Sequence, residues 1–373
     1  MKRVLFIFGT RPEAIKMSPL ISRFREDPDS WKVGVCVTAQ HREMLDQVLE
    51  FFQVEVDYDL DLMTAGQSLT QLTARCLVAL EHPLADFQPD LVFVQGDTTT
   101  VLTGALAAYY QHVPVAHIEA GLRSGNRYSP FPEELNRLLA GRLAEYHFAP
   151  TPAAVASLAA EGIRDNVWMV GNTVIDALQD ALEILKHRGD SMRRHFPFLD
   201  ESKKLVLVTG HRRESFGKPF ENICGALSDI AAAHEDVQIV YPVHLNPQVQ
   251  EPVRRILADR DNVHLIEPLD YARLVWLMSK TWLVLTDSGG IQEEAPSLGV
   301  PVLVMRDVTE RMEGVQAGTA RLVGTDRQTI VREALKLIED EQAHAAMANA
   351  VNPYGDGTTA RQVVQITHDI LKP

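Results

Sequence analysis

The chain has 373 residues, of which 46% are hydrophobic, 23% charged and 7% aromatic, a composition typical of globular proteins. At roughly 150 residues per domain, this length predicts two or three domains. The formal net charge of −14 argues against broad nucleic-acid binding, and the absence of a signal peptide or an apolar run near the ~18 residues that span a bilayer predicts a cytoplasmic protein.

Short apolar runs alternate with helical patterns along most of the chain. Runs such as "LVFV" and "LVLV" do not alternate with polar residues, so they suit strands that are covered on both faces, as in a parallel sheet. The sequence therefore predicts an α/β protein. The expected strands are Val4–Phe8, Lys32–Thr38, Leu91–Gln95, Val113–Ile118, Tyr146–Ala149, Val167–Val170, Lys204–Thr209, Val237–Tyr241, Val263–Ile266, Trp282–Thr286 and Val300–Val304.

The predicted strands fall into two sets. About eleven strands are too many for a plain eight-stranded barrel, and "KRVLFIFGTR" is echoed weakly by "KKLVLVTGHR". We therefore predict two Rossmann-like lobes whose parallel sheets face a central cleft, an amino-terminal lobe of residues 1–170 plus 355–373 and a carboxy-terminal lobe of 171–354. The loop "NPYGDGTTA" precedes a last amphipathic helix from about Thr359 to Leu371.

The first strand is followed by a tight turn at Gly9 and by a helix that carries Arg11 and Lys16. A nucleotide-binding chain usually has its phosphate loop here, but the sequence matches neither G-x-G-x-x-G nor G-x-x-x-x-G-K-[ST]. Ligands of open parallel sheets bind beyond the carboxyl ends of the strands, so the residues after each strand are the candidates for a site.

Two carboxylates follow strands of the first half. Asp97, in "GDTTT", could act as a helix N-cap, which is a structural role. Glu119 ends a buried strand, where a carboxylate without a partner is costly, so we favour a functional role. The preceding "HIE" resembles part of the zinc-deaminase pattern, but its P-C-x-x-C partner is absent.

The segment "YSPFPEELNRLLAGRLA" predicts a helix with Pro132 at its first position. Glu133 and Glu134 then lie in the first turn, where the helix dipole favours acidic residues without any catalytic role. The expected buried stripe of this helix consists of Leu135, Leu138, Leu139 and Leu143.

The second half opens with "GHRRE" after a strand, where three ionisable side chains in a row are poor packing residues. His211 could donate to a phosphate or transfer a proton, and Arg212 and Arg213 could bind anions, although one could instead pair with Glu214. His244, in "YPVHLNP", is another strand-end histidine for which structural and functional roles are equally open.

The stretch "LTDSGGIQEEAPSLGVPVLVMRDVTER" is the most informative. Ser288, Gly289 and Gly290 form a turn between a strand and a helix, where backbone N–H groups favour phosphate and glycine permits close approach. Glu294 lies about one helical turn later and can accept hydrogen bonds from ribose hydroxyls. With Arg311 after the next strand, this order indicates a nucleotide-sugar site.

Taken together, the motifs resemble those of bacterial non-hydrolysing UDP-N-acetylglucosamine 2-epimerases, which have the two-lobed GT-B-type fold of a glycosyltransferase superfamily. The resemblance covers nearly the whole chain. It rests on "FGTRPEAIKM", "TAQHREMLDQVL", "GDTTT", "EAGLR", "SPFPEE", "GNTVIDA", "GHRRE", "YPVHLNP", "LTDSGGIQEEAPSLG", "TER" and "NPYGDG", in this order.

The resemblance implies an isomerase that eliminates UDP to form a glycal and adds it back with the opposite configuration at C2. It implies no cofactor and no metal. The catalytic positions would be Asp97, Glu119, Glu133 and His211. Substrate binding would involve Arg11 and Lys16 at the diphosphate, Ser288, Gly289 and Gly290 at the phosphates, Glu294 at the ribose, and Arg311 at the nucleotide end.

The resemblance also implies a regulatory site for UDP-N-acetylglucosamine beside the catalytic cleft, and a homodimer. The regulatory positions would be Gln40, Glu43, Glu134, Arg212 and His244. Their presence favours the non-hydrolysing, allosteric type. The three cysteines include no C-x-x-C pair, so we expect buried thiols rather than a disulfide or zinc site.

Three positions depart from the family pattern. Met312 stands where proline is usual, Leu274 stands where an aromatic residue often lies against the uracil, and Gln95 stands where histidine is common. The last difference leaves open the hydrogen bonds around Asp97.

Three other functions stay open. A glycosyltransferase of the same fold would need an acceptor site and leaves the carboxylates unexplained. A hydrolysing epimerase would release free N-acetylmannosamine and UDP. A non-catalytic sensor would bind the nucleotide sugar without turnover.

Overall fold

The computed structural model describes residues 1–38, 42–64 and 66–372. Contacts between Cα atoms divide the chain into two compact units. Unit 1 comprises Met1–Asp180 together with the chain from Tyr354 onward, and unit 2 comprises Ala181–Pro353. The passage from unit 1 to unit 2 falls within one helix, α7 (Thr173–Lys186).

Unit 1 contains, within the described residues, a seven-stranded parallel sheet with the order β3-β2-β1-β4-β5-β6-β7. Its strands are β1 (Lys2–Phe8), β2 (Trp31–Val37), β3 (Tyr58–Asp59), β4 (Leu91–Gln95), β5 (Val115–Ile118), β6 (Tyr146–Ala149) and β7 (Val167–Met169). Its helices are α1 (Arg11–Arg25), α2 (Arg42–Phe51), α3 (Leu69–Phe87), α4 (Thr99–Tyr110), α5 (Glu133–Leu143), α6 (Pro152–Ala160), the first half of α7, and α16 (Thr359–Ile370).

Unit 2 contains a six-stranded parallel sheet with the order β10-β9-β8-β11-β12-β13, again counted over the described residues. Its strands are β8 (Lys204–Thr209), β9 (Val237–Pro242), β10 (Val263–Ile266), β11 (Leu283–Thr286), β12 (Val302–Val304) and β13 (Ala320–Leu322). Its helices are α8 (Gly189–Arg193), α9 (Lys218–Ala233), α10 (Pro247–Leu257), α11 (Tyr271–Met278), α12 (Gly289–Glu294), α13 (Met312–Ala317), α14 (Arg327–Glu339) and α15 (Glu341–Ala348).

The α/β class and the two parallel sheets predicted from the sequence are confirmed. Every predicted strand is present, and its ends lie within two residues of the predicted ones. Two further strands, β3 and β13, were not predicted. Both lie at an edge of a sheet and have only two and three residues, so neither forms an apolar run that a strand pattern could detect.

Aromatic packing joins the middle of the unit 1 sheet to α1. Phe6 of β1 stacks on Phe93 of β4 with ring centroids 4.8 Å apart, and Phe24 of α1 contacts both rings. All three side chains are fully buried, so one face of the central strands is covered by α1. Burial also extends to Cys36, Cys76 and Cys224, which are free thiols as expected from the sequence.

The predicted leucine stripe of α5 is wrong. None of its four leucines is fully buried, and Leu139 is 43% exposed. The buried face of α5 consists instead of Glu134, Asn136, Ala140 and Gly141. Small and polar residues face inward because Glu134 and Asn136 hydrogen-bond the loops beside the helix. The helix also begins at Glu133, one residue after the predicted first position at Pro132.

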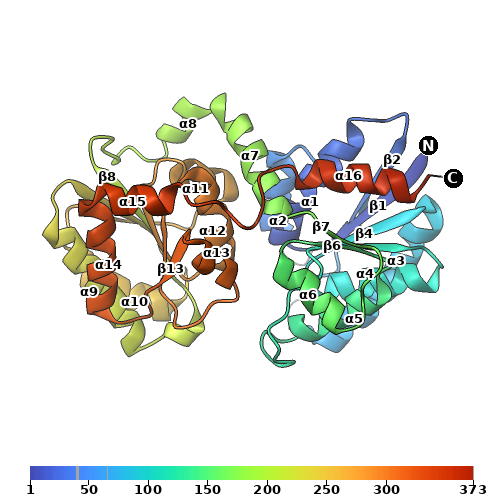
Figure 1. Ribbon diagram of the computed structural model, residues 1–373, viewed down its shortest axis with the longest axis horizontal. Helices are drawn as coiled ribbons and strands as arrows, with labels where there is room; N and C mark the ends of the chain where they lie inside the picture. The colour runs from blue at the N-terminus through green and yellow to red at the C-terminus, as the bar shows by residue number, and fades with distance from the viewer. Residues whose placement is uncertain (39–41, 65, 373) are drawn as a thin grey trace. The chain divides into compact units, whose positions relative to one another are not determined.

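The carboxy-terminal helix α16 packs beside α1 in unit 1, as the red and blue helices of Figure 1 show. The backbone N–H of Asn172 donates to the carbonyl oxygen of Tyr354 at 2.7 Å. The Thr359 hydroxyl donates to the Val170 carbonyl at 2.8 Å, and Asp176 Oδ1 accepts from the Ala360 N–H at 2.8 Å. These bonds attach the start of α16 and the loop before it to α7 and to the residues between β7 and α7.

Replacing Asp176 with Asn should stabilise the protein at neutral pH. Burial raises the pKa of Asp176 from 3.8 to about 6, so folding favours its neutral form. Stability is therefore lost as the pH rises from about 4 to 6, because only the unfolded chain ionises easily there. Since an Asn amide oxygen can still accept from Ala360, we expect Asp176→Asn to gain about 1–3 kcal/mol at pH 7.

The gain should shrink to near zero at pH 4, where the native Asp176 is already protonated. Thermal unfolding midpoints of both proteins, measured at pH 7 and pH 4, check this difference. A variant that is equally stable or less stable at pH 7 would contradict the expected cost of the buried charge.

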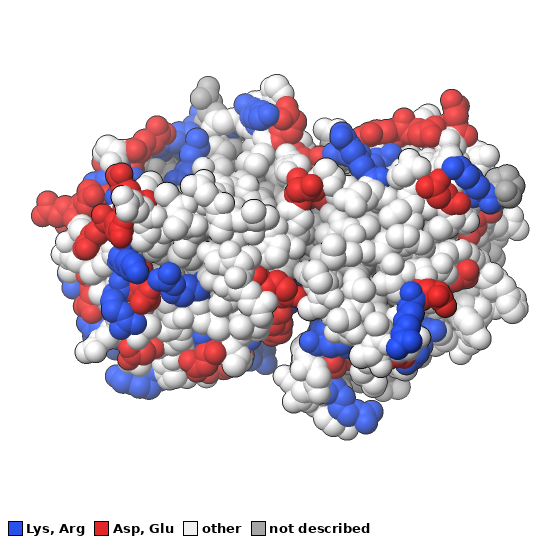
Figure 2. All heavy atoms as spheres, in the orientation of Figure 1, with Lys and Arg blue, Asp and Glu red and all other residues white. Residues whose placement is uncertain are grey.

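Acidic and basic side chains are interspersed on the face of the molecule shown in Figure 2, without a continuous basic patch. Among the helices that the structure describes, none combines the length and the apolar character that crossing a membrane requires.

Candidate active site

Three neighbouring strands of unit 1 bring the candidate residues of the first half to one edge of the sheet. β1, β4 and β5 lie side by side in parallel. Thr10 follows β1, Asp97 follows β4 and Glu119 follows β5. The carboxyl ends of these strands therefore meet at one edge, as the parallel arrangement predicted.

Glu119 is held in an unusual conformation. Its φ is +63°, in the left-handed region that non-glycine residues seldom occupy, and the residue is 7% exposed. Its Oε2 atom accepts hydrogen bonds from both Lys16 Nζ and Gln95 Nε2. Such backbone strain costs of order 1 kcal/mol and concentrates at functional sites, so the conformation supports a role for Glu119 beyond packing.

The Gln95 side chain contacts Glu119 directly. Gln95 is 3% exposed at the end of β4, and Glu119 directly follows the neighbouring strand β5. The glutamine at position 95, where the family commonly has histidine, therefore affects the hydrogen bonds of Glu119. Lys16, predicted as a diphosphate ligand, is brought to the same carboxylate from α1.

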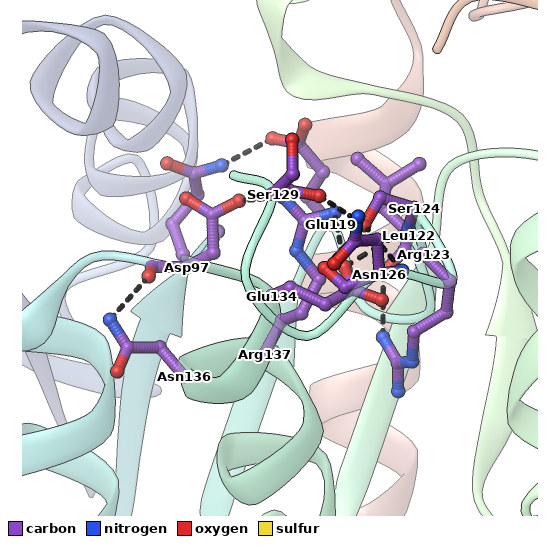
Figure 3. Close-up of polar contacts among 12 residues, drawn as sticks. Asp97, Glu119, Leu122, Arg123, Ser124, Asn126, Ser129, Glu134, Asn136 and Arg137 are labelled. Atoms are coloured by element: carbon purple, nitrogen blue, oxygen red, sulfur yellow. Dashed lines mark hydrogen bonds and ion pairs between the residues drawn. The ribbon is translucent and has the colours of Figure 1, made fainter. Parts of the chain in front are cut away.

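Asp97 is held by residues of α5, as Figure 3 shows. Arg137 forms an ion pair with Asp97 Oδ2, and the Asn136 amide donates to the Asp97 carbonyl oxygen at 2.9 Å. Arg137 also lies 3.2 Å from Glu134 Oε2 through its other terminal nitrogen. Sequence reasoning missed Arg137 and Asn136, although they fall one helical turn after the predicted Glu133 and Glu134.

Glu133 and Glu134 have different surroundings at the start of α5. Glu134 is 2% exposed, and its carboxylate accepts from the backbone N–H groups of Ser124 and Gly125 at 3.0 and 3.1 Å. Glu133 is half-buried, and within the described part of the chain its buried Oε2 has no hydrogen-bond partner. Glu134 thus fixes the loop drawn in Figure 3, whereas one buried oxygen of Glu133 makes no hydrogen bond to the described residues.

Glu13, which was not among the predicted site residues, fixes the conformation of the loop after β1. Its Oε2 accepts from the N–H groups of Gly9 and Thr10 at 3.0 and 2.8 Å, and Oε1 accepts from the Thr98 hydroxyl at 2.7 Å. Burial raises the pKa of Glu13. The signal was present in "TRPE", which is a capping box at the start of α1. This carboxylate therefore joins the loop after β1 to the start of α4.

His117 supports the turn that carries Asp97. Its Nε2 lies 2.7 Å from the Gly96 carbonyl oxygen, and the residue is 1% exposed. Burial lowers the pKa of His117 to about 4, so the ring is neutral at pH 7 and donates through Nε2. The histidine of "HIE" thus has a structural hydrogen bond, and within the described residues no group of three or more His, Cys, Asp or Glu could hold a metal ion.

Unit 2 presents a second set of candidates beyond β8, β9 and β11. His211 follows β8, and its ring stacks on the ring of His244 after β9, with centroids 5.4 Å apart. Asp287, which directly follows β11, is 1% exposed and lies 3.4 Å from His211 Nδ1 through Oδ1. Asp287 was not among the predicted site residues, although it lies in the strand-end stretch "LTDSGG".

The predicted turn of Ser288, Gly289 and Gly290 precedes a helix, as expected, with Ser288 as N-cap of α12. Glu294, the predicted ribose ligand, is 6% exposed, and its Oε1 accepts from the Tyr271 hydroxyl at 3.1 Å. A Cβ atom placed on Gly289 would lie 3.6 Å from the Arg311 guanidinium carbon, which brings the predicted Arg311 to this turn.

Ion pairs hold the loop after β12 in place. Arg311 Nε lies 2.7 Å from Glu293 Oε1, and Arg306 Nε lies 2.7 Å from Glu214 Oε1. Arg306 also bonds Glu310 at 3.0 Å. Burial alone would raise the pKa of Glu310, but the hydrogen bond from Arg306 and the charges of Arg306 and Arg311 lower it to about 2. One buried guanidinium therefore links the "HRRE" and "TER" motifs.

The remaining predicted residues are distributed as follows. Arg11 is half-buried at the start of α1, Glu43 is exposed on α2, Arg212 is half-buried and His244 is exposed. Gln40 lies outside the described residues. Among the family departures, Leu274 is half-buried in α11, and Met312 is 42% exposed at the start of α13.

Comparison with known proteins gives consistent matches over nearly the whole chain. The sequence pattern of the UDP-N-acetylglucosamine 2-epimerase family matches residues 23–368. The Escherichia coli K12 UDP-N-acetylglucosamine 2-epimerase is 57% identical over 97% of both chains.

Solved structures agree with this match. The Neisseria meningitidis UDP-GlcNAc 2-epimerase bound to UDP-GlcNAc has a TM-score of 0.91 at 49% identity, covering 98% of this chain and 100% of that one. The Methanocaldococcus jannaschii enzyme in complex with UDP-GlcNAc and UDP has a TM-score of 0.80 at 33% identity, covering 98% and 99%. The chain therefore belongs to the UDP-N-acetylglucosamine 2-epimerase family.

Proposed function

We propose that this protein catalyses the reversible C2 epimerisation of UDP-N-acetylglucosamine to UDP-N-acetylmannosamine and supplies cell-surface polysaccharide synthesis. Relatives that share its full length act on or bind UDP-N-acetylglucosamine. The observation that carries the proposal is the strained, buried Glu119, whose carboxylate meets Lys16 at an edge of the sheet where Asp97 also lies.

The chemistry of the substrate accounts for several carboxylates. C2 of the sugar has no neighbouring carbonyl group, so its proton is not acidic. Elimination of UDP from C1 with loss of the C2 proton forms a glycal, and re-addition with a proton on the opposite face gives the epimer. This route needs proton-transfer groups on both faces of the ring and cations at the departing diphosphate.

We assign proton transfer to Asp97, Glu119 and Glu133 of unit 1. Ion pairs with Arg137 and Lys16 hold the Asp97 and Glu119 carboxylates in place, and a carboxylate can accept the C2 proton. Glu133 has a buried oxygen without a hydrogen-bond partner in the described part of the chain, where a substrate hydroxyl or a proton could bind. Lys16 and Arg11 would contact the diphosphate from α1.

We assign most of the binding of UDP to unit 2. The N–H groups after Ser288, in the turn of Gly289 and Gly290, would bind phosphate, and the buried Glu294 would accept from the ribose hydroxyls. Arg311, fixed by Glu293, would neutralise charge at the nucleotide end. His211 would exchange a proton with the departing diphosphate.

The test is proton NMR of the purified protein with UDP-N-acetylglucosamine in heavy water and without any acceptor. Appearance of UDP-N-acetylmannosamine, with deuterium at C2 of both sugars, would support epimerisation by exchange with solvent. Free N-acetylmannosamine plus UDP would establish the hydrolysing reaction instead. Binding without turnover would contradict an epimerase and favour a sensor or a transferase.

We also propose regulation by UDP-N-acetylglucosamine through Arg212, His244, Glu43, Gln40 and Glu134. Replacing Arg212 with Ala retains its backbone N–H bond to Asp287, so the loop can keep its conformation while the cation is lost. We expect the rate of UDP-N-acetylmannosamine conversion to respond less to added UDP-N-acetylglucosamine. A response curve identical to that of the wild type would remove Arg212 from the regulatory site, and His244→Ala tests the site independently.

We propose a homodimer as well. Val78 of α3 and Tyr109 and Tyr110 of α4 are 69%, 59% and 67% exposed on two helices that pack against each other, and such exposed apolar side chains are candidates for a contact with a second copy. Light scattering at several protein concentrations would give twice the chain mass for a dimer, and a mass of one chain would contradict it.

A further inference from the structure

A buried carboxylate lies directly behind the proposed acid–base histidine. β11 pairs with β8, with Thr286 opposite Thr209, so the residues after the two strands are neighbours. Asp287 Oδ2 accepts from the backbone N–H groups of His211 and Arg212, each at 2.7 Å. The residue is 1% exposed. Both backbone bonds end on the same oxygen of this carboxylate.

The other oxygen faces the imidazole. Asp287 Oδ1 lies 3.4 Å from His211 Nδ1 and has no hydrogen-bond partner within the described residues. A buried carboxylate oxygen that lacks a hydrogen-bond donor costs folding free energy. The nitrogen that can supply this donor is His211 Nδ1, when it carries a proton. Hydrogen bonds of catalytic groups are often long in the unliganded protein and shorten when the substrate binds.

We propose that Asp287 is a positioning residue that keeps a proton on His211 Nδ1 and leaves Nε2 as the nitrogen that exchanges protons with the ligand. The proposal rests on the proposed function only in giving His211 a catalytic task. Which ring nitrogen of a histidine carries the proton is set by the bond that the other nitrogen makes, and a carboxylate at Nδ1 selects the Nδ1–H tautomer.

The protons balance in both directions of the reaction. In the charged state His211 carries protons on both nitrogens, and Nε2 gives its proton to an oxygen of the departing diphosphate. The ring is then neutral with its remaining proton on Nδ1, still facing Asp287. During re-addition Nε2 takes the proton back, so the ring returns to its charged form without rotating.

The other groups around His211 oppose its charged form. Desolvation lowers the pKa of His211, the Asp287 carboxylate raises it, and the stacked His244 ring and the Arg212 guanidinium lower it. Asp287 is thus the one group among these that favours the imidazolium. Removing its charge should change the tautomer and shift the pKa of His211 further down.

The direct test is nitrogen-15 NMR of the His211 ring in the wild-type protein. Long-range proton–nitrogen correlations distinguish a protonated from an unprotonated ring nitrogen, and a His211→Gln sample identifies the His211 signals. At a pH above the His211 pKa we expect a protonated Nδ1 and an unprotonated Nε2. The opposite tautomer would overturn the proposal, whether or not the protein turns over any nucleotide sugar.

Asp287→Asn is the matched variant. The Asn oxygen can still accept from the two backbone N–H groups, but its amide would donate to Nδ1 and move the ring proton to Nε2. We expect the tautomer to switch, kcat to fall at least about tenfold with KM changed less than about threefold, and the limb of the pH–rate profile due to His211 to move to lower pH. Loss of kcat with an unchanged tautomer and pH profile would show a merely structural role and overturn the proposal.

Discussion

Glu119→Gln should lower turnover by about 100-fold or more while UDP affinity stays within a few-fold of the wild type. The neutral amide cannot accept the C2 proton, and it no longer forms an ion pair with Lys16. UDP affinity should largely persist because we assign most contacts with UDP to unit 2, whereas Glu119 belongs to unit 1 and its replacement removes neither Lys16 nor Arg11. Initial rates by NMR and UDP binding by calorimetry measure the two effects separately.

The control for this variant is Glu145→Gln. Glu145 is exposed and directly precedes β6, the strand beside β5, so it lies at the opposite edge of the same sheet. The Glu145→Gln variant should keep wild-type turnover. If Glu119→Gln turned over like the wild type, Glu119 would lose its catalytic assignment, and equal losses in both variants would indicate a general effect of removing charge.

Asp97→Asn should also reduce turnover by about two orders of magnitude or more, with little change in UDP affinity. Arg137 binds the Asp97 carboxylate and positions it, and the neutral amide of the variant cannot accept the C2 proton. Asn136 contacts the Asp97 carbonyl rather than its side chain, so the turn should keep its conformation in the variant. The readout is deuterium incorporation at C2, which reports proton transfer even when net epimerisation is slow.

Asp90→Asn provides the comparison for Asp97. Asp90 directly precedes β4, and its carboxylate accepts from the Arg3 N–H at 2.7 Å, at the end of the strand away from Asp97. We expect Asp90→Asn to affect stability more than turnover. Normal deuterium exchange in Asp97→Asn would exclude this residue from proton transfer.

The strands and the residues that follow them were predictable because a buried parallel strand needs an uninterrupted apolar run. Asp97, Glu119 and His211 were selected as strand-end residues on this basis. The partners of these residues were not predictable, because Lys16 is 103 positions from Glu119 in sequence and only the folded sheet brings them together. Glu13 could have been predicted because it lies in a capping box, and Asp287 because it directly follows a predicted strand.

The error in α5 has a physical origin. A leucine every three or four residues predicts an inward apolar face, but the helix start is anchored by Glu134 and Asn136, which turns polar residues toward the sheet. Helical periodicity indicates which residues share a face, whereas hydrogen bonds to neighbouring loops decide which face is buried.

The attachment of α16 to α1 has a consequence for synthesis of the chain. Unit 2 is one continuous segment, Ala181–Pro353, whereas unit 1 is completed only by the residues that follow it. On the ribosome, unit 2 therefore has its whole sequence available before α16 exists, although most of unit 1 is translated earlier. Domains generally fold as units as they emerge from the ribosome. The face of α1 that α16 covers should therefore stay exposed while unit 2 folds. Unit 1, whose translation begins first, is therefore the last unit whose fold can be completed.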